Sequence, residues 1–267
     1  MTATQFSVVT TMSSMRTVVV LIACVQATLC CNRAVTKSPS ENAYERLFSD
    51  LFADYDPAVV PMKKPPANSG DNSNAINLGV SLSVLNMDLD KDSGLMTLNG
   101  WLSLSWTDYR LSWDPAQYNG LSTIRVPNSK MWLPDPAVYN EWGYGPGDAN
   151  TMLAKSHYNV VVSSSGFIIY VLPVSMKLDC SNEDVWSYNE KESSCHAKVG
   201  LWTYDGNHLN ITTFPGKDER MELDYFSYNS PYLVKSQEQQ SIFTKKYSCC
   251  EEPYMHVDYR SNLVGKK

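Results

Sequence analysis

The 267 residues carry 28 acidic and 22 basic side chains, a net charge of −6, and 43% of them are hydrophobic. This length and composition can fill the core of one large all-β domain, whereas the acidic balance and the lack of a basic patch in the sequence argue against nucleic acid as a partner. The sequence contains 7 Trp and 16 Tyr, and such aromatic side chains are by default expected in the core.

The first 31 residues have the pattern of a signal peptide. Arg16 precedes the segment 17–31, whose apolar core of about a dozen residues has the length of a secretory h-region. A membrane span needs about 20 apolar residues, and the longest later apolar run, 167–174, is shorter still. A short N-terminal anchor is the alternative. We expect a secreted, extracellular chain without a membrane span, in which residues 32–267 form one folded domain.

One helix is expected at the start of this domain. Residues 41–55 repeat apolar side chains at helical spacing, a capping segment at 40–42 precedes them, and Asp56-Pro57 ends the pattern. Residues 61–74 then form a connector rich in turn residues.

From Ile76 onward the apolar period changes to two, which is typical of strands. Short strands separated by Gly, Asn, Asp and Pro turns predict an all-β, immunoglobulin-like β-sandwich of about ten strands with an N-terminal α-helix. The expected strands lie at 76–90, 95–109, 197–203, 231–236, 240–248 and 254–260, with two more in 159–178 that are joined at residues 164–166.

Four cysteines remain once the leader is set aside. Cys180, Cys195, Cys249 and Cys250 suggest two disulfides in an oxidising compartment, and three pairings are possible. The last two are adjacent, so their α-carbons lie about 3.8 Å apart, whereas ordinary disulfides span roughly 4.4–6.8 Å. From the residues alone, this pair is free, bound to a metal, joined to other partners, or closed into a strained eight-membered ring.

Four aromatic residues have contexts that differ from those of core residues. Tyr139 follows a Pro-rich turn, Trp202 ends an expected strand, and Tyr247 and Tyr254 flank the cysteine pair. Aromatic rings around an apolar hole bind ammonium ligands, because the ring faces attract the cation. Spacing alone does not show that these four converge. Structural positions in the core or at a sheet rim are expected for Trp106, Trp113 and Trp132.

The sequence carries no pattern that predicts catalysis or metal binding. Its Ser, His and Asp residues lie in no nucleophile elbow, and its histidines have no ligand spacing. We therefore expect no cofactor and no metal. The absence of any triad context disfavours a secreted choline ester hydrolase. The sequon at 210–212 makes Asn210 a candidate glycosylation site. Ordinary surface or sheet positions are expected for His157, His196, His208 and His256.

Five motifs in order give the chain a specific resemblance. It resembles the extracellular ligand-binding domain of the Cys-loop (pentameric ligand-gated) receptor family, nicotinic α type, and is most similar in kind to the soluble acetylcholine-binding proteins. The resemblance implies an assembly as a ring of five copies, a homopentamer, that binds small cationic ligands between neighbours. The motifs are WLSLSWTDYRLSWDP (101–115), MWLPDPAVYN (131–140), the loop from Cys180 to Cys195, KVGLWTYDG (198–206) and YSCCEEPY (247–254).

The resemblance assigns residues to two faces of the binding site. On the principal face it implies Tyr139, Trp202, Tyr247 and Tyr254 as rings around the cation, with Lys198 behind them. It also implies the disulfides Cys180–Cys195 and Cys249–Cys250, the second at the tip of a mobile loop. The complementary face of the next copy would supply Trp101, Ser103, Val161, Ile169, Val171 and Tyr225.

Three departures from the family pattern favour a binding protein over a channel. The segment 181–194 is mostly polar, where channel subunits carry an apolar stretch that meets the membrane domain. The sequence stops where channels continue into a membrane helix. His256 stands where nicotinic subunits carry an Asp that accompanies Lys198 and Tyr247, so that charge arrangement is expected to be altered. We predict a secreted protein that captures acetylcholine; the alternative is the extracellular part of a truncated channel subunit.

Overall fold

A computed structural model describes residues 42–143, 158–180 and 192–266. The chain divides into two units, residues 1–46 and 47–267, and all strands belong to the second. The predicted signal peptide, His157 and most of the loop from Cys180 to Cys195 lie outside the described residues.

The predicted N-terminal helix is present but shorter than expected. Helix α2 spans Ala43–Phe52 instead of 41–55. The side-chain oxygen of Asn42 accepts the backbone N–H of Tyr44 at 2.9 Å, which satisfies one of the free donors at the helix start. Past Phe52 the chain leaves the helix, and the hydroxyl of Tyr55 donates a hydrogen bond to Asp108.

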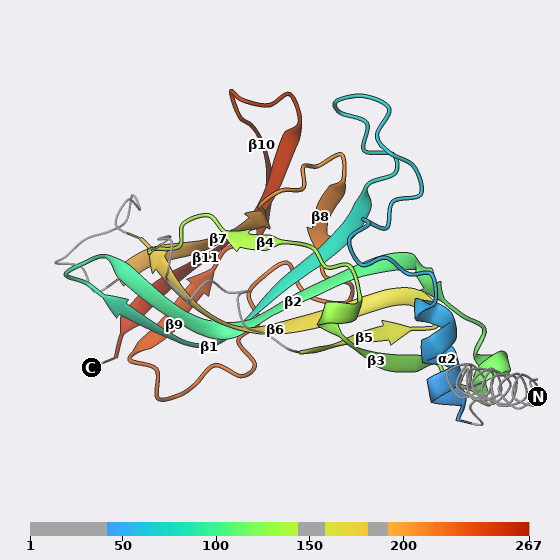
Figure 1. Ribbon diagram of the computed structural model, residues 1–267. Coiled ribbons are helices and arrows are strands. Elements are labelled where there is room, and N and C mark those ends of the chain that lie inside the picture. Colours follow the sequence, from blue (N-terminus) through green and yellow to red (C-terminus); the bar gives the residue numbers. More distant parts are fainter. Residues whose placement is uncertain (1–41, 144–157, 181–191, 267) are drawn as a thin grey trace, which may run out of the picture. The chain divides into compact units, whose positions relative to one another are not determined.

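Two sheets make up the domain (Figure 1). The first has the order β3-β5-β6-β2-β1-β8, and the second has the order β10-β11-β7-β4 with β9 paired to β11. All described pairings are antiparallel except that of β1 with β8. The first sheet contains β1 (Ile76–Asp90), β2 (Leu95–Ser112), β3 (Thr123–Pro127), β5 (Asn159–Ser163), β6 (Ser165–Asp179) and β8 (Leu209–Thr213). The second contains β4 (Pro136–Val138), β7 (Glu192–Leu201), β9 (Tyr232–Gln237), β10 (Ser241–Lys246) and β11 (Pro253–Gly265).

The architecture confirms the predicted immunoglobulin-like β-sandwich. Every predicted strand is present, but its bounds differ: β7 and β11 are longer than expected, and β10 ends at Lys246 instead of residue 248. The short strands β3, β4 and β8 were not predicted, since runs of three to five residues carry little periodicity. Two 3-10 helices, Pro115–Tyr118 and Asn128–Lys130, complete the described elements.

Alternation along the long strands fills the core between the sheets. On β2 and β6 every second residue is buried, among them Leu102, Leu104 and Leu172. Trp106 and Trp132 are almost fully buried, with ring centroids 6.0 Å apart in an edge-to-face arrangement. Trp113 packs against the same cluster from a partly buried position. The structural roles predicted for these three tryptophans are confirmed.

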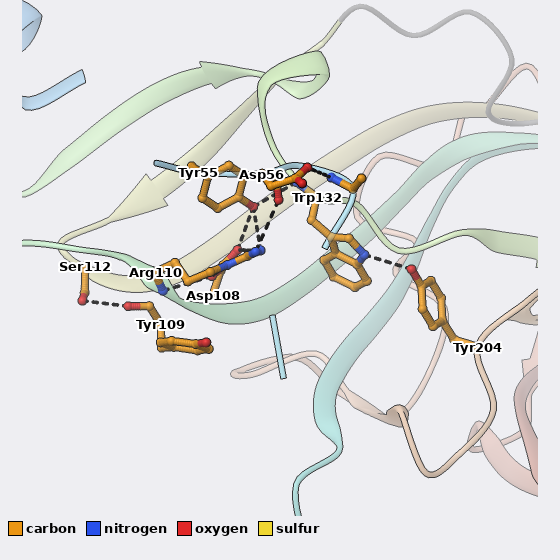
Figure 2. Close-up of polar contacts among 9 residues, drawn as sticks. Tyr55, Asp56, Asp108, Tyr109, Arg110, Ser112, Trp132 and Tyr204 are labelled. Carbon is orange, nitrogen blue, oxygen red and sulfur yellow. Dashed lines mark hydrogen bonds and ion pairs between the residues drawn. The ribbon is translucent and has the colours of Figure 1, made fainter. Parts of the chain in front are cut away.

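A buried ion pair fixes the segment that follows the helix (Figure 2). The carboxylate of Asp108 is fully buried and accepts two hydrogen bonds from the Arg110 guanidinium, at 2.8 and 2.9 Å. The hydroxyl of Tyr55 donates to Asp108 at 2.8 Å and accepts from Arg110 and from the backbone N–H of Trp132, each at 3.0 Å. Burial, the largest effect, raises the pKa of Tyr55 above its ordinary value, so this hydroxyl stays protonated and can donate.

The same network continues toward the segment that contains Trp202. The indole N–H of Trp132 donates to the hydroxyl of Tyr204 at 3.0 Å, and the two rings pack edge to face at 5.6 Å (Figure 2). Asp135 then accepts the backbone N–H of Trp202 on its carbonyl, at 3.1 Å, and the backbone N–H of Thr203 on its carboxylate, at 2.8 Å. Two loops that are distant in sequence are thereby bound to each other.

Replacing Arg110 with Met should lower the free energy of unfolding by about 3–5 kcal/mol, because it leaves the buried carboxylate of Asp108 without its cation. Chemical denaturation measures the change. The matched control is Arg125→Met on an exposed position of β3, where we expect less than about 0.5 kcal/mol. Equal losses for the two variants would contradict the role given to the ion pair.

Candidate ligand-binding site

Tyr139 is held against β7 by its backbone and by its hydroxyl. It follows β4, and its N–H donates to the carbonyl of Lys198 at 2.8 Å. Its hydroxyl donates to the carbonyl of Leu201 at 2.7 Å. A Cβ atom at Gly200 would overlap the ring of Tyr139, so glycine at this position allows the ring to lie on the strand. Tyr139 is therefore fixed at three points.

Trp202 directly follows Leu201, whose carbonyl accepts a hydrogen bond from the hydroxyl of Tyr139. Its backbone is held by the carbonyl of Asp135. Its side chain is 66% exposed, which is unusual for the largest apolar side chain. Trp202 therefore combines a fixed backbone with a largely exposed side chain.

A hairpin carries the two remaining rings of the predicted principal face. We call β10, the turn 247–252 and the start of β11 the lid hairpin; Figure 1 shows β10 and its turn extending away from the rest of the second sheet. The rings of Tyr247 and Tyr254 pack edge to face at 5.7 Å. Cys249 and Cys250 are bonded to each other at the tip, where the N–H of Cys250 donates to the carbonyl of Tyr247 at 3.1 Å.

The lid hairpin and Tyr139 lie close enough to affect each other. Burial raises the pKa of Tyr139 to about 12, and the next largest contribution comes from Tyr247, with a smaller one from Tyr254. His256, on β11, has its ring centroid 5.7 Å from that of Tyr139. His256 is opposite Gly200 in the pairing of β11 with β7, and Tyr254 precedes it by two residues, so Tyr139, Tyr247 and Tyr254 lie toward the same end of the second sheet. Spacing alone did not show this.

An acidic residue does lie across from Lys198, although not at position 256. In the pairing of β11 with β7, Asp258 stands opposite Lys198. Nε2 of His256 lies 3.6 Å from Oδ1 of Asp258. Burial, the largest effect, lowers the pKa of His256 and raises that of Asp258. The predicted contact of Lys198 with Tyr247 stays a prediction.

The residues predicted for the complementary face lie on the other sheet. Trp101 and Ser103 alternate on β2 with the buried Leu102 and Leu104, so they point away from the core. Ser103 pairs with Val171 of β6, which is exposed. Two residues before Val171 on β6, Ile169 pairs with Val161 of β5, and both side chains are half-buried. These residues form one continuous patch on the outer surface of the first sheet.

Tyr225 joins this patch through a loop that is fastened to β1. Its ring packs edge to face on Trp101 at 5.3 Å. Upstream, Glu222 exchanges backbone hydrogen bonds of 2.8 Å with Leu82 and Val84. Its carboxylate accepts from Ser81 and from Lys217, each at 2.8 Å. Glu222 therefore fixes the loop from which Tyr225 reaches Trp101.

Two further predicted features lie away from both faces. Cys180 and Cys195 are buried and bonded to each other, with α-carbons 5.3 Å apart. Asn210 is partly exposed on the edge strand β8, where its side-chain amide donates to Asn77 at 2.9 Å. Its glycosylation stays a prediction.

Sequence reasoning missed the residues that position the rings. Gly200 and Asp135 lie inside two of the quoted motifs, but only the folded backbone shows that one admits the ring of Tyr139 and the other holds Trp202. Tyr204 and Glu222 act across long separations in sequence. Asp258 could have been found, because it follows His256 by two and so lies on the same strand face.

Comparison with known proteins identifies the family. Residues 44–264 match the family described as the neurotransmitter-gated ion-channel ligand binding domain, and the chain belongs to it. It is 32% identical over 219 residues to the neuronal acetylcholine receptor subunit alpha-4 of Gallus gallus and of Homo sapiens, covering 82% of this chain and 32% of each relative. It is 31% identical over 220 residues to the neuronal acetylcholine receptor subunit alpha-2 of Mus musculus, covering 82% of this chain and 39% of the relative.

These matches confirm the predicted membership of the Cys-loop receptor family, nicotinic type. The chain spans about a third of the length of the curated relatives it matches. In the described part of the chain, no helix has both the length and the apolar character that a membrane crossing needs. Among the same residues, no group of three or more His, Cys, Asp or Glu side chains is arranged to hold a metal ion.

The hydrogen bonds that the Glu222 carboxylate accepts from Ser81 and Lys217 predict a pH-dependent free energy of unfolding. Burial alone would raise the pKa of Glu222, but the hydrogen bonds from Lys217 and Ser81 outweigh it, and the pKa lies below its ordinary value. Such a carboxylate stabilises the folded state fully above the unfolded pKa and loses this effect as the pH falls through the lower folded pKa. The advantage of the wild type over Glu222→Gln in unfolding free energy should be constant from pH 7 to about 5 and shrink below.

Chemical denaturation of both proteins at each pH measures this difference. A difference in unfolding free energy that stays unchanged at the acid end would show that the ionised form of Glu222 does not stabilise the fold.

Proposed function

We propose that this domain captures acetylcholine and similar small cationic ligands in an aromatic cage between neighbouring copies of the chain, without catalysis. The observation that supports the proposal is that Tyr139, Tyr247 and Tyr254 lie toward the end of the second sheet where Trp202 follows Leu201, the residue whose carbonyl binds the hydroxyl of Tyr139. Electron-rich ring faces attract an ammonium group by about 0.5–2 kcal/mol or more per ring once water is excluded.

The chemistry of the four rings suits a quaternary ammonium ligand. Such a cation has no N–H to donate, so it gains little from a carboxylate partner and much from ring faces and apolar contact. The carbonyl of Leu201 is already hydrogen-bonded to Tyr139, so it is not needed by the ligand. The exposed hairpin that carries Tyr247 and Cys249–Cys250 can close over the ligand as a lid.

Two copies are needed because the two predicted faces lie on different sheets. The principal rings are on or beside strands of the second sheet, whereas Trp101 and Val171 are on the outer surface of the first. Trp202 and Val171 are both exposed in the single chain, at 66% and 43%. A ring of five identical copies, the arrangement implied by the resemblance to pentameric receptors, would place one face against the other at every interface.

We further propose that this domain is a secreted protein; the alternative is that it is the extracellular part of a channel subunit. The supporting observation is the segment 181–194, SNEDVWSYNEKESS, which is largely polar. A loop that meets a membrane domain gains from apolar residues, whereas a loop in water does not. The His256–Asp258 pair, in place of the acid expected at 256, is a second difference from the nicotinic pattern.

A mixing experiment tests the shared site. Trp202→Ala should weaken acetylcholine binding by at least about 30-fold, the equivalent of 2 kcal/mol for a desolvated cation–π contact, and Trp101→Ala should weaken it from the other face. Displacement of a labelled nicotinic ligand measures both. Co-expression of the two variants should restore part of the sites, because some interfaces then combine two intact faces.

The control is Trp142→Ala, an exposed tryptophan outside the proposed site, which should bind as the wild type does. Saturable binding that survives in Trp202→Ala, or no recovery in the mixture, would contradict a cage shared between copies.

The secreted form predicts that cells expressing the full sequence release it into the medium as a ring of five. Mass measurement by light scattering after size exclusion should give about five times the mass of the glycosylated mature chain. A full-length transcript that encodes downstream membrane spans would instead favour the channel subunit and leave the ligand site unaffected.

A further inference from the structure

The lid hairpin contains a cation of its own beside the proposed cage. The ammonium nitrogen of Lys245 lies 4.9 Å from the ring centroid of Tyr247, within the range of a cation–π contact. This contact places the side chains of Lys245 and Tyr247 on the same side of the hairpin. In the pairing of β10 with β11, Lys245 is directly opposite Tyr254.

Other contacts place this lysine in the same group of side chains. Phe243, two residues before Lys245, stacks on His256 at 5.3 Å, and His256 lies 5.7 Å from Tyr139. The charge of Lys245 also reaches the imidazole of His256, where it adds to the effect of burial in lowering the pKa. Lys245 therefore belongs to the face of the hairpin on which the cage rings lie.

We infer that Lys245 sets the ligand affinity of the cage by acting as an intramolecular cation that competes with the ligand for the ring of Tyr247. This inference rests on the proposed function. A ligand ammonium that binds to Tyr247 must displace the ammonium of Lys245, which returns to water because β10 is exposed along its whole length. The competition applies to cationic ligands and not to neutral molecules of the same shape.

A different role for Lys245 would have the opposite consequence. If its contact only held Tyr247 in place for the ligand, removing the ammonium would weaken binding. If it acted only through general surface charge, any lysine on β10 would have the same influence. The neighbouring Lys246 distinguishes these cases, since it pairs with Pro253 and alternation points it to the other side of the strand.

The experiment compares Lys245→Met, which keeps the aliphatic stem, with the matched control Lys246→Met. Isothermal titration measures the affinity of each oligomer for acetylcholine and for its uncharged isostere, 3,3-dimethylbutyl acetate. Lys245→Met should bind acetylcholine about two- to fivefold more tightly, the equivalent of about 0.5–1 kcal/mol for an exposed cation–π contact. Its affinity for the isostere, and both affinities of Lys246→Met, should stay as in the wild type.

Each other outcome overturns the inference. Weaker or unchanged binding of acetylcholine by Lys245→Met would exclude competition, and equal gains in both variants would reduce the effect to surface charge. An equal gain for the isostere would show that steric access, and not the cation, had been relieved. If the wild type binds acetylcholine and Lys245→Met binds it with the same affinity, this inference alone is refuted. If neither the wild type nor any variant binds acetylcholine, the proposed function and the inference are refuted together.

Discussion

The buried carboxylate of Asp108 is the constraint on which the arrangement of this domain depends. A carboxylate without water needs a cation and hydrogen-bond donors, and here Arg110 and Tyr55 supply them. Meeting that requirement places the hydroxyl of Tyr55 where it also accepts the N–H of Trp132. Trp132 in turn binds Tyr204. The network therefore connects the chain after the helix, β2 and the two loops that lead to the candidate site.

The candidate site follows from strand register and close backbone approach more than from the choice of aromatic residues. Tyr139 can lie on β7 only because Gly200 has no side chain, and its hydroxyl then occupies the carbonyl next to Trp202. On the other sheet, pairing of β2 with β6 brings Ser103 beside Val171, and Glu222 fastens the loop that places Tyr225 on Trp101. Each half is thus built independently, with one set of rings held by rigid strands.

The lid hairpin differs physically from both halves. Its strand β10 is exposed throughout and pairs with β11 alone among the described strands. Few buried contacts stabilise such a hairpin, so it can open and close at little free-energy cost. Aromatic rings on this element can adapt to a ligand, whereas Tyr139 and Trp202 are tied to the sheet by backbone hydrogen bonds. A cage that combines fixed rings with adjustable ones can admit a ligand and then exclude water.

The sequence by itself determined the fold class, the positions of the long strands, the core tryptophans and the family, because period-two alternation and contiguous motifs are local properties. It could not determine that Tyr139, Tyr247 and Tyr254 gather, that Gly200 admits a ring, or that Asp258 faces Lys198. It also gave no sign that the ammonium of Lys245 lies over the ring of Tyr247. Those relations depend on register between strands that are far apart in sequence, and a shift of one residue would turn every side chain to the opposite face.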